Sequence, residues 1–138
     1  MSVAVLADTG PLVALFSKRD RHHSWAIEAF KTLKPPLLTC DAVLAEVLFL
    51  LRSDGRSVSF LMGLLERRVL ISEFSVQKEA INLRKLMTKY SDTPMDFADA
   101  CLVRMSELVS DCSVWTVDSD FGVYRRNGRA RIPMIYPT

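Results

Sequence analysis

The chain has 138 residues, 49% of them hydrophobic and 25% charged, and its formal net charge is +2. This composition and length favour one globular domain, which we expect to span residues 1–138, and they exclude a mainly disordered chain. No apolar stretch approaches the roughly 18 residues of a membrane-spanning helix, so we expect no membrane partner. Residues 1–7 do not resemble a signal peptide and the three cysteines are too scattered for a disulfide framework, so we expect a cytoplasmic protein.

Short apolar runs and amphipathic segments alternate along the whole chain. The run at 3–7 (VAVLA) predicts a buried strand, and Pro11 suits the first turn of a helix that reaches about Phe16. We then expect, in order, a helix at 23–33, a strand at 37–40, a helix from Asp41 to about Arg52, and a helix at 58–67 that follows a stop at Gly55 and a cap at Ser57. The second half predicts a strand at 69–74, a helix at 76–89, a helix from Thr93–Asp96 to about Val109, and strands at 113–117 and 132–136.

This alternation predicts an α/β fold. Right-handed crossovers between the strands would give a central parallel sheet of four to five short strands with helices on both faces. In such sheets, functional sites form at the carboxyl ends of the strands, near a switch point in the strand order. Side chains that directly follow the strands are therefore the first candidates for a site.

Carboxylates occur where the local composition does not call for them. Asp8 follows the first strand, and Asp118 follows the fourth, with Asp120 close behind. Glu46 is the only charged residue in the apolar segment 42–51. Asp96 and Asp99 are three residues apart at the start of a helix and therefore share one face.

Structural roles could account for several of these acids. Asp8 suits a turn and Asp118 suits a helix cap. Thr93 and Asp96 resemble a capping box, and Asp99 lies where a helix dipole favours an anion. Glu46 is harder to explain, because a carboxylate in an apolar helix is costly unless it is paired or bound to a metal ion.

The acids as a set indicate a metal site. They can converge at one end of the sheet, where they would repel one another unless a cation lay among them. Carboxylate oxygens select Mg²⁺ or Mn²⁺ rather than zinc, and a water on such an ion can attack a phosphodiester. The adjacent His22 and His23 would point apart on a helix, so we interpret them as surface residues.

Four segments that carry these acids follow one another in a definite order. They are Asp8-Thr9-Gly10-Pro11-Leu12-Val13-Ala14, then Glu46 in its apolar helix, then Asp96-Phe97-Ala98-Asp99-Ala100, then Thr116-Val117-Asp118-Ser119-Asp120-Phe121. This ordered set resembles the PIN-domain family, and within it the VapC-type toxin ribonucleases of toxin–antitoxin pairs. The resemblance covers essentially the whole chain.

The resemblance implies one PIN-like nuclease domain with a three-layer α/β/α fold and Mg²⁺- or Mn²⁺-dependent cleavage of RNA. The acidic quartet of the family, which supplies the catalytic residues and metal ligands, corresponds here to Asp8, Glu46, Asp99 and Asp118. Asp96 and Asp120 are additional candidate ligands. Thr9 and Thr116 are candidate supporting residues, with Thr116 matching a hydroxyl position that can orient the last aspartate. A cognate antitoxin and a homodimer are also implied.

Other α/β families fit less well. A receiver domain needs an acidic pair after the first strand and a late lysine, but no lysine follows Lys89. A haloacid-dehalogenase-like phosphatase needs a second aspartate where Gly10 stands, and a dinucleotide-binding protein needs a glycine-rich first turn. Two alternatives with the same fold stay open: an RNA-binding or interaction module without cleavage activity, and a nuclease directed at DNA.

Two further features suggest partner surfaces. The acid-free segment 121–138 holds four arginines, which we expect to bind RNA phosphates beside the metal: Arg125, Arg126, Arg129 and Arg131. Tyr124 is a candidate for stacking on a base. The helices at 42–51 and 58–65 are more apolar than surface helices require, so we expect an antitoxin helix to lie in a groove there.

Overall fold

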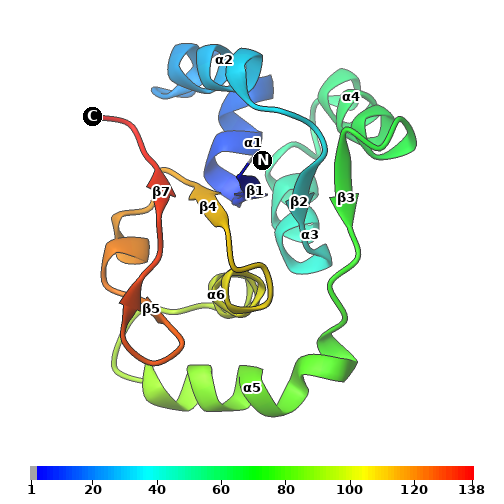
Figure 1. The fold of residues 1–138 in the computed structure, drawn as a ribbon. Coiled ribbons are helices and arrows are strands. Elements are labelled where there is room, and N and C mark those ends of the chain that lie inside the picture. Colours follow the sequence, from blue (N-terminus) through cyan, green and yellow to red (C-terminus); the bar gives the residue numbers. More distant parts are fainter. Residues whose placement is uncertain (1–2) are drawn as a thin grey trace.

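Five short parallel strands form one sheet in the computed structural model, which describes residues 3–138 (Figure 1). Their spatial order is β3-β2-β1-β4-β7, with β1 at Ala4–Ala7, β2 at Leu37–Thr39, β3 at Leu70–Ser72, β4 at Cys112–Trp115 and β7 at Met134–Ile135. The predicted central parallel sheet is confirmed. Met1 and Ser2, the first residues of the expected domain, lie outside the described range.

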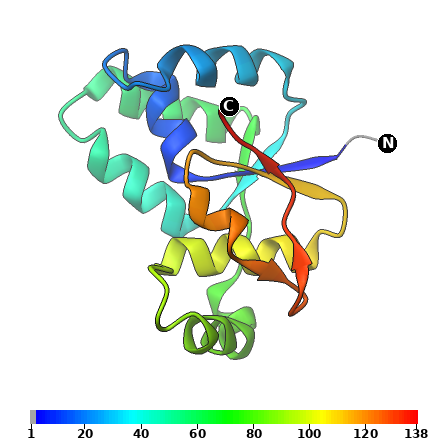
Figure 2. The ribbon, with the colours of Figure 1, turned by 90° about the vertical axis from the view of Figure 1, so that its left-hand side faces the viewer.

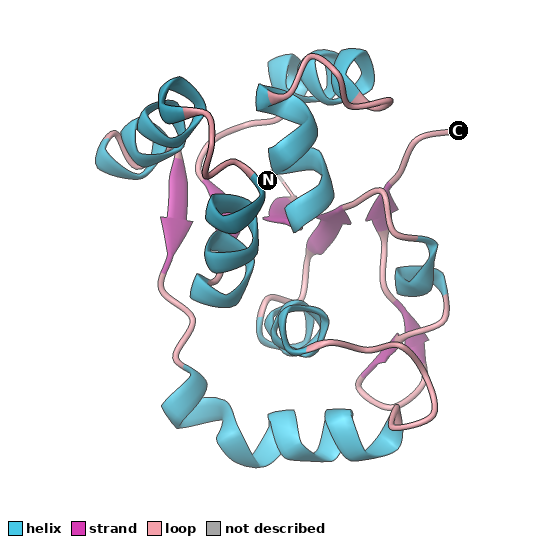
Figure 3. Cartoon of the chain, turned by 180° about the vertical axis from the view of Figure 1, so that it is seen from behind, coloured by secondary structure: helices cyan, strands magenta, loops and turns pink. Residues whose placement is uncertain are grey.

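Helices cover both faces of this sheet, as the α/β/α prediction requires (Figure 2). On one side lie α1 (Thr9–Phe16) and α2 (His23–Thr32). On the other lies α6 (Phe97–Leu108), against which α5 (Val76–Lys89) packs. Between β2 and β3 the chain forms the helical hairpin of α3 (Asp41–Leu50) and α4 (Gly55–Glu66), and α3 contacts both α1 and α6 (Figure 3).

The central strands β1 and β4 are the most important for the site. They pair in parallel, with Ala7 opposite Trp115, and the backbone N–H of Asp8 donates to the carbonyl of Trp115 at 3.0 Å. The indole of Trp115 is fully buried and stacks on Phe30 of α2, with 6.3 Å between ring centroids. This packing fixes the point at which both strands end, and therefore the place where the residues that follow them emerge.

Two helices begin at different residues from those expected. Gly55 is the first residue of α4 rather than a stop signal, because the Asp54 side chain caps the helix and accepts the backbone N–H and the hydroxyl of Ser57. Similarly, α6 begins after Asp96, whose carboxylate accepts the N–H of Asp99 at 2.8 Å. Asp96 is thus itself the cap, which replaces the alternative of a capping box that begins at Thr93.

The segment between β4 and β7 contains structure that the strand pattern did not predict. A 3-10 helix, η1 (Ser119–Gly122), leads into an antiparallel hairpin of β5 (Arg125–Arg126) and β6 (Ala130–Arg131). Asn127 and Gly128 form its turn with positive φ angles of 53° and 84°. The Asn-Gly dipeptide is a strong hairpin signal and could have identified this turn from the sequence.

No helix in residues 3–138 has the length and apolar character needed to cross a membrane.

Candidate active site

Asp8 directly follows β1 and is almost fully buried, with 5% of its surface exposed. Its Oδ1 accepts the backbone N–H of Thr9 at 2.8 Å, and its Oδ2 accepts the hydroxyl of Thr116 at 2.7 Å. Burial raises the pKa of Asp8 from 3.8 to about 6; these hydrogen bonds lower it, and the Asp118 and Glu46 carboxylates raise it. Asp8 therefore caps α1 and also forms part of an acidic cluster.

Asp118 emerges beside Asp8 from the neighbouring strand. Its backbone N–H donates to the hydroxyl of Thr116 at 2.9 Å, and its own Oδ1 accepts the N–H of Asp120 at 2.9 Å, which starts η1. The pKa of Asp120 is raised by burial and by the Asp118 carboxylate. A single side chain, that of Thr116, thus holds the carboxylate of Asp8 and the backbone of Asp118.

Asp99 approaches from the first turn of α6 and is buried, with 6% of its surface exposed. Burial and the carboxylates of Asp96, Asp8 and Asp118 together raise its pKa from 3.8 to about 7. Its Oδ2 accepts the hydroxyl of Tyr124 at 2.8 Å, a contact that lowers this pKa.

Tyr124 is therefore a site residue that sequence reasoning misplaced. Its side chain is fully buried, so it cannot stack on an RNA base as expected. Phe121, with which it packs, is also fully buried. From the sequence, only an alternation of apolar and polar residues after Asp118 could have indicated that Tyr124 is buried. The segment is too short to show such an alternation.

Glu46 is supplied by α3, which is the helix that contacts both α1 and α6. Its carboxylate is partly buried, and its Oε1 accepts the hydroxyl of Thr9 at 2.7 Å. No lysine, arginine or histidine within residues 3–138 forms a salt bridge with it. The hydroxyl of Thr9 thus supports Glu46, while its backbone N–H supports Asp8.

Asp8 lies within electrostatic range of the other three predicted acids, at the ends of β1 and β4. These strands are neighbours whose crossovers lie on opposite faces, which is the switch point at which α/β proteins place their sites. In the described part of the chain, no group of three His, Cys, Asp or Glu side chains is close enough to hold a metal ion. The chemistry of the donors nevertheless fits Mg²⁺ or Mn²⁺, because all are carboxylates and because their repulsion is what a cation would relieve.

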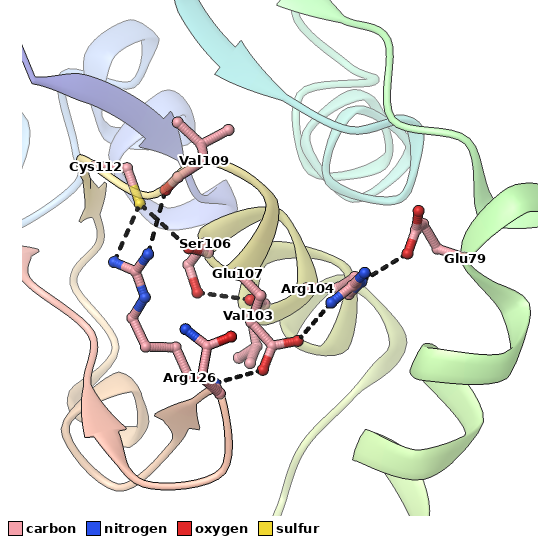
Figure 4. A network of polar contacts seen from close by, with 9 residues as sticks. Glu79, Val103, Arg104, Ser106, Glu107, Val109, Cys112 and Arg126 are labelled. Carbon is pink, nitrogen blue, oxygen red and sulfur yellow. Dashed lines mark hydrogen bonds and ion pairs between the residues drawn. The ribbon is translucent and has the colours of Figure 1, made fainter.

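The four arginines are less uniform than expected, because they occupy both faces of the β5–β6 hairpin. The guanidinium of Arg126 is buried and donates to the carbonyl of Val109 at 3.3 Å and to the sulfur of Cys112 (Figure 4). It also donates to the carbonyl of Ser110 at 2.9 Å. The guanidinium of Arg125 donates to three carbonyls of the preceding turn, residues 122–124. The buried Arg126 guanidinium and Nη1 of Arg125 are therefore engaged by the protein itself, which differs from the expected role of these side chains as phosphate contacts.

Arg129 and Arg131 are exposed, and neither side chain forms a hydrogen bond or salt bridge with residues 3–138. Their hairpin is held against the C-terminal half of α6, where the N–H of Asn127 donates to Glu107 at 2.7 Å. Asp99 lies eight residues earlier on the same helix, which corresponds to about 12 Å along its axis. The exposed arginines thus lie to one side of the acids rather than directly beside them.

An apolar groove of about 550 Å³ lies between α1, α2 and α4. It is lined by Leu15, Phe16, His23, Ile27, Phe30, Phe60 and Leu64, among others, with Lys18, Asp54 and Arg56 at the polar positions. Phe60 is 62% exposed, and its ring lies 6.2 Å from that of Phe16. The sequence predicted a groove on the hairpin of α3 and α4; of these two helices, only α4 lines the groove, and α1 and α2 supply the rest.

Comparisons with known proteins agree with this fold. The family model of the PIN domain matches residues 5–127. Among solved structures, VapC20 of Mycobacterium tuberculosis, described as a sarcin–ricin loop cleaving toxin, is similar with a TM-score of 0.76 at 19% sequence identity, over 87% of this chain and 94% of that one. At this identity the likeness establishes the shared fold. No match was found among curated proteins.

Proposed function

Because the chain belongs to the PIN domain family, we propose that it is a metal-dependent endoribonuclease of the VapC toxin type. The single observation that best supports this proposal is the pair of buried carboxylates, Asp8 and Asp99. They come from different elements and each is held by a hydroxyl, yet burial and neighbouring acids raise the pKa of both. Such an arrangement is unfavourable for a protein that never binds a cation.

We propose that Asp8, Glu46, Asp99 and Asp118 would hold Mg²⁺ or Mn²⁺, with Asp96 and Asp120 as supporting acids at the rim. The bound ion would supply a nucleophilic water and neutralise charge on the cleaved phosphodiester. Capping of α6 already engages one carboxylate oxygen of Asp96, which favours a minor role for this residue.

The chain's own residues would orient the acids and hold the substrate. Thr116 and Thr9 keep Asp8 and Glu46 in place, as their hydrogen bonds of 2.7 Å support. For phosphate binding we propose Arg129 and Arg131, because their guanidinium groups are exposed and are not engaged by residues 3–138. Such contacts would bind RNA without selecting its sequence. We also propose that the enzyme acts in the cytoplasm.

For the toxin role, we propose that a cognate antitoxin places an apolar helix in the groove between α1, α2 and α4. The exposed ring of Phe60 and the apolar lining support this occupant. Co-purification of the chain with the product of the reading frame directly upstream tests the proposal. We expect Phe60→Asp to abolish capture, and Ile81→Asp, an equally exposed apolar residue on α5, to leave it intact. Equal capture by both variants would contradict this groove as the docking site.

We also propose a homodimer. Phe49 and Leu50 support it, because both are more than half exposed at the end of α3 and neither lines the antitoxin groove. Light scattering at high protein concentration tests this part of the proposal separately. A measured mass equal to that of one chain would contradict the proposed homodimer and would leave the nuclease proposal intact.

The nuclease proposal itself is tested by incubating the purified protein with Mg²⁺ and either a single-stranded RNA or a DNA of the same sequence. We expect cleavage of the RNA that leaves a 5′-phosphate. Asp99→Asn should abolish it, whereas Asp92→Asn, an exposed aspartate of the loop before α6, should not. Cleavage of DNA alone, or RNA binding without cleavage in Mg²⁺ and in Mn²⁺, would replace the proposal with one of the two alternatives.

A further inference from the structure

Tyr124 is held rigidly at the junction between η1 and the β5–β6 hairpin. Its ring is fully buried and packs edge-on against two other aromatic rings, with centroid distances of 5.2 Å to Tyr90 and 5.3 Å to Phe121. The interplanar angles of 71° and 87° leave the phenol little freedom to turn. A phenol fixed in this way delivers its hydroxyl to one defined position.

That position is a single oxygen of Asp99. The Tyr124 hydroxyl donates to Oδ2 at 2.8 Å. No donor within residues 3–138 forms a hydrogen bond with Oδ1 of Asp99. Within residues 3–138, the buried side-chain atom without a hydrogen-bond partner is Nε1 of Trp115. Oδ1 of Asp99 also has no partner but is not such a buried atom, so solvent reaches it. One oxygen of Asp99 is therefore anchored, and the other is available to a ligand.

Asp8 also has a hydroxyl anchor, although its Oδ1 accepts the backbone N–H of Thr9 as well. There, Thr116 donates to Oδ2 at 2.7 Å from a fully buried hydroxyl. Each of the two buried acids thus has its own hydroxyl anchor, and the anchors come from the two ends of the segment 116–124. Thr116 was expected from the family resemblance, whereas nothing in that resemblance points to Tyr124.

We propose that Tyr124 is a positioning residue that fixes the orientation of the Asp99 carboxylate so that Oδ1 faces an incoming divalent cation. This inference rests on the proposed metal-dependent function. Tyr124 does not touch substrate or metal in this role. It acts only through Asp99, because its hydroxyl has already used its proton on Oδ2.

Tyr90 provides a matched control. Its ring packs against the same phenol, but its hydroxyl accepts the backbone N–H of Arg125 at 2.8 Å and touches no carboxylate. Tyr90→Phe and Tyr124→Phe therefore each remove one hydroxyl from the same aromatic cluster and keep both rings. Only Tyr124→Phe removes the anchor of Asp99.

The experiment measures Mn²⁺ affinity by calorimetry for the wild type and both variants, alongside thermal unfolding without metal. We expect Tyr124→Phe to weaken Mn²⁺ binding by about 10- to 100-fold, as removal of the hydrogen-bond partner of a metal ligand commonly does, while Tyr90→Phe binds like the wild type. The Tyr124→Phe protein should melt no lower than Tyr90→Phe. Its cleavage rate should recover as Mn²⁺ is raised.

Unchanged Mn²⁺ affinity in Tyr124→Phe, beside a wild type that binds Mn²⁺ and cleaves RNA, would overturn this inference alone. A Tyr124→Phe protein that no longer folds would also overturn it, because the hydroxyl would then be a structural anchor. A wild type that neither binds Mn²⁺ nor cleaves RNA would contradict the proposed function itself, and the positioning role would fall with it.

Discussion

The hydroxyl of Thr116 donates a hydrogen bond to Oδ2 of Asp8 across 108 positions of the sequence, with 2.7 Å between the two oxygens. The same hydroxyl accepts the backbone N–H of Asp118 at 2.9 Å. One buried side chain therefore sets the relative placement of two acids that follow neighbouring strands. This connection makes Thr116 the residue through which the ends of β1 and β4 are joined.

Removing that hydroxyl should damage the site more than the fold. Thr116→Val keeps the shape of the side chain but leaves Asp8 and the N–H of Asp118 without their partner, and we expect a loss of about 1–3 kcal/mol in stability together with most of the cleavage activity. Thr116→Ser restores the hydroxyl and should recover much of the activity. Urea unfolding and RNA cleavage measure the two effects, and a fully active Thr116→Val protein would contradict the assignment.

The metal-free protein should become more stable as the pH falls. Burial and neighbouring acids raise the pKa of Asp8 to about 6 and that of Asp99 to about 7, both from 3.8. At pH values between the pKa of the unfolded state and that of the folded state, the native protein binds more protons than the unfolded protein. The free energy of unfolding therefore decreases as the pH rises through this window. Stability is thus highest at its acid end.

Urea unfolding in EDTA at about pH 5.5 and about pH 7.5 checks this prediction. We expect the larger free energy of unfolding at the lower pH, and a smaller difference between the two in Asp99→Asn. At the higher pH, the free energy of unfolding of Asp8→Asn should exceed that of the wild type by roughly 1–2 kcal/mol. We expect this variant to cleave no RNA. Equal stability of the wild type at both pH values would contradict the raised pKa values of Asp8 and Asp99.

Gly10 permits a close approach that any larger residue would block. A Cβ at this position would lie 2.3 Å from a methyl carbon of Val117, which stands between Thr116 and Asp118. Gly10→Ala should therefore displace that segment, costing about 1–3 kcal/mol of stability and much of the activity. Gly55→Ala is the control, because a Cβ there meets no atom within 4 Å. The same stability for both variants would indicate that Val117 moves aside freely.

The arginines of the hairpin should separate into two classes. Arg129→Ala with Arg131→Ala should raise the RNA concentration that gives half-maximal rate and reduce the salt dependence of binding, by roughly 0.7 log–log units for each RNA phosphate that is no longer neutralised. Arg126→Ala should instead destabilise the fold, because it leaves the carbonyls of Val109 and Ser110 without their donor. Cleavage rates over a range of RNA concentrations at two salt levels make the distinction. An unchanged half-saturation point in the double variant would show that these two arginines do not bind RNA.

The convergence of the acids could be predicted because it follows from topology. Asp8 and Asp118 end parallel strands, and strands that alternate with helices bring their carboxyl ends to one edge. Glu46 was recognisable because a charge inside an apolar helix needs an explanation. In each case the position of the backbone was enough, and no detail of side-chain packing was required.

Features that depend on which way a side chain turns could not be predicted. Arg126 and Arg129 look alike in the sequence, and only the hairpin turn at Asn127 and Gly128 sends one inward to the end of α6 and leaves the other exposed. The contact between Tyr124 and Asp99 likewise depends on η1, a single turn with no periodic pattern. The groove between α1, α2 and α4 could not be predicted, because the sequence does not show that α1 and α2 face α4.

The catalytic role of the acids is tested most directly by the RNA cleavage rate of the protein stripped of metal with EDTA and then supplied with Mg²⁺ or Mn²⁺. We expect no cleavage in EDTA, recovery on adding either ion, and no recovery in Asp8→Asn at any ion concentration while that variant stays folded. Cleavage at the full rate in excess EDTA, or by Asp8→Asn, would show that the acidic cluster at the ends of β1 and β4 is not the catalytic centre.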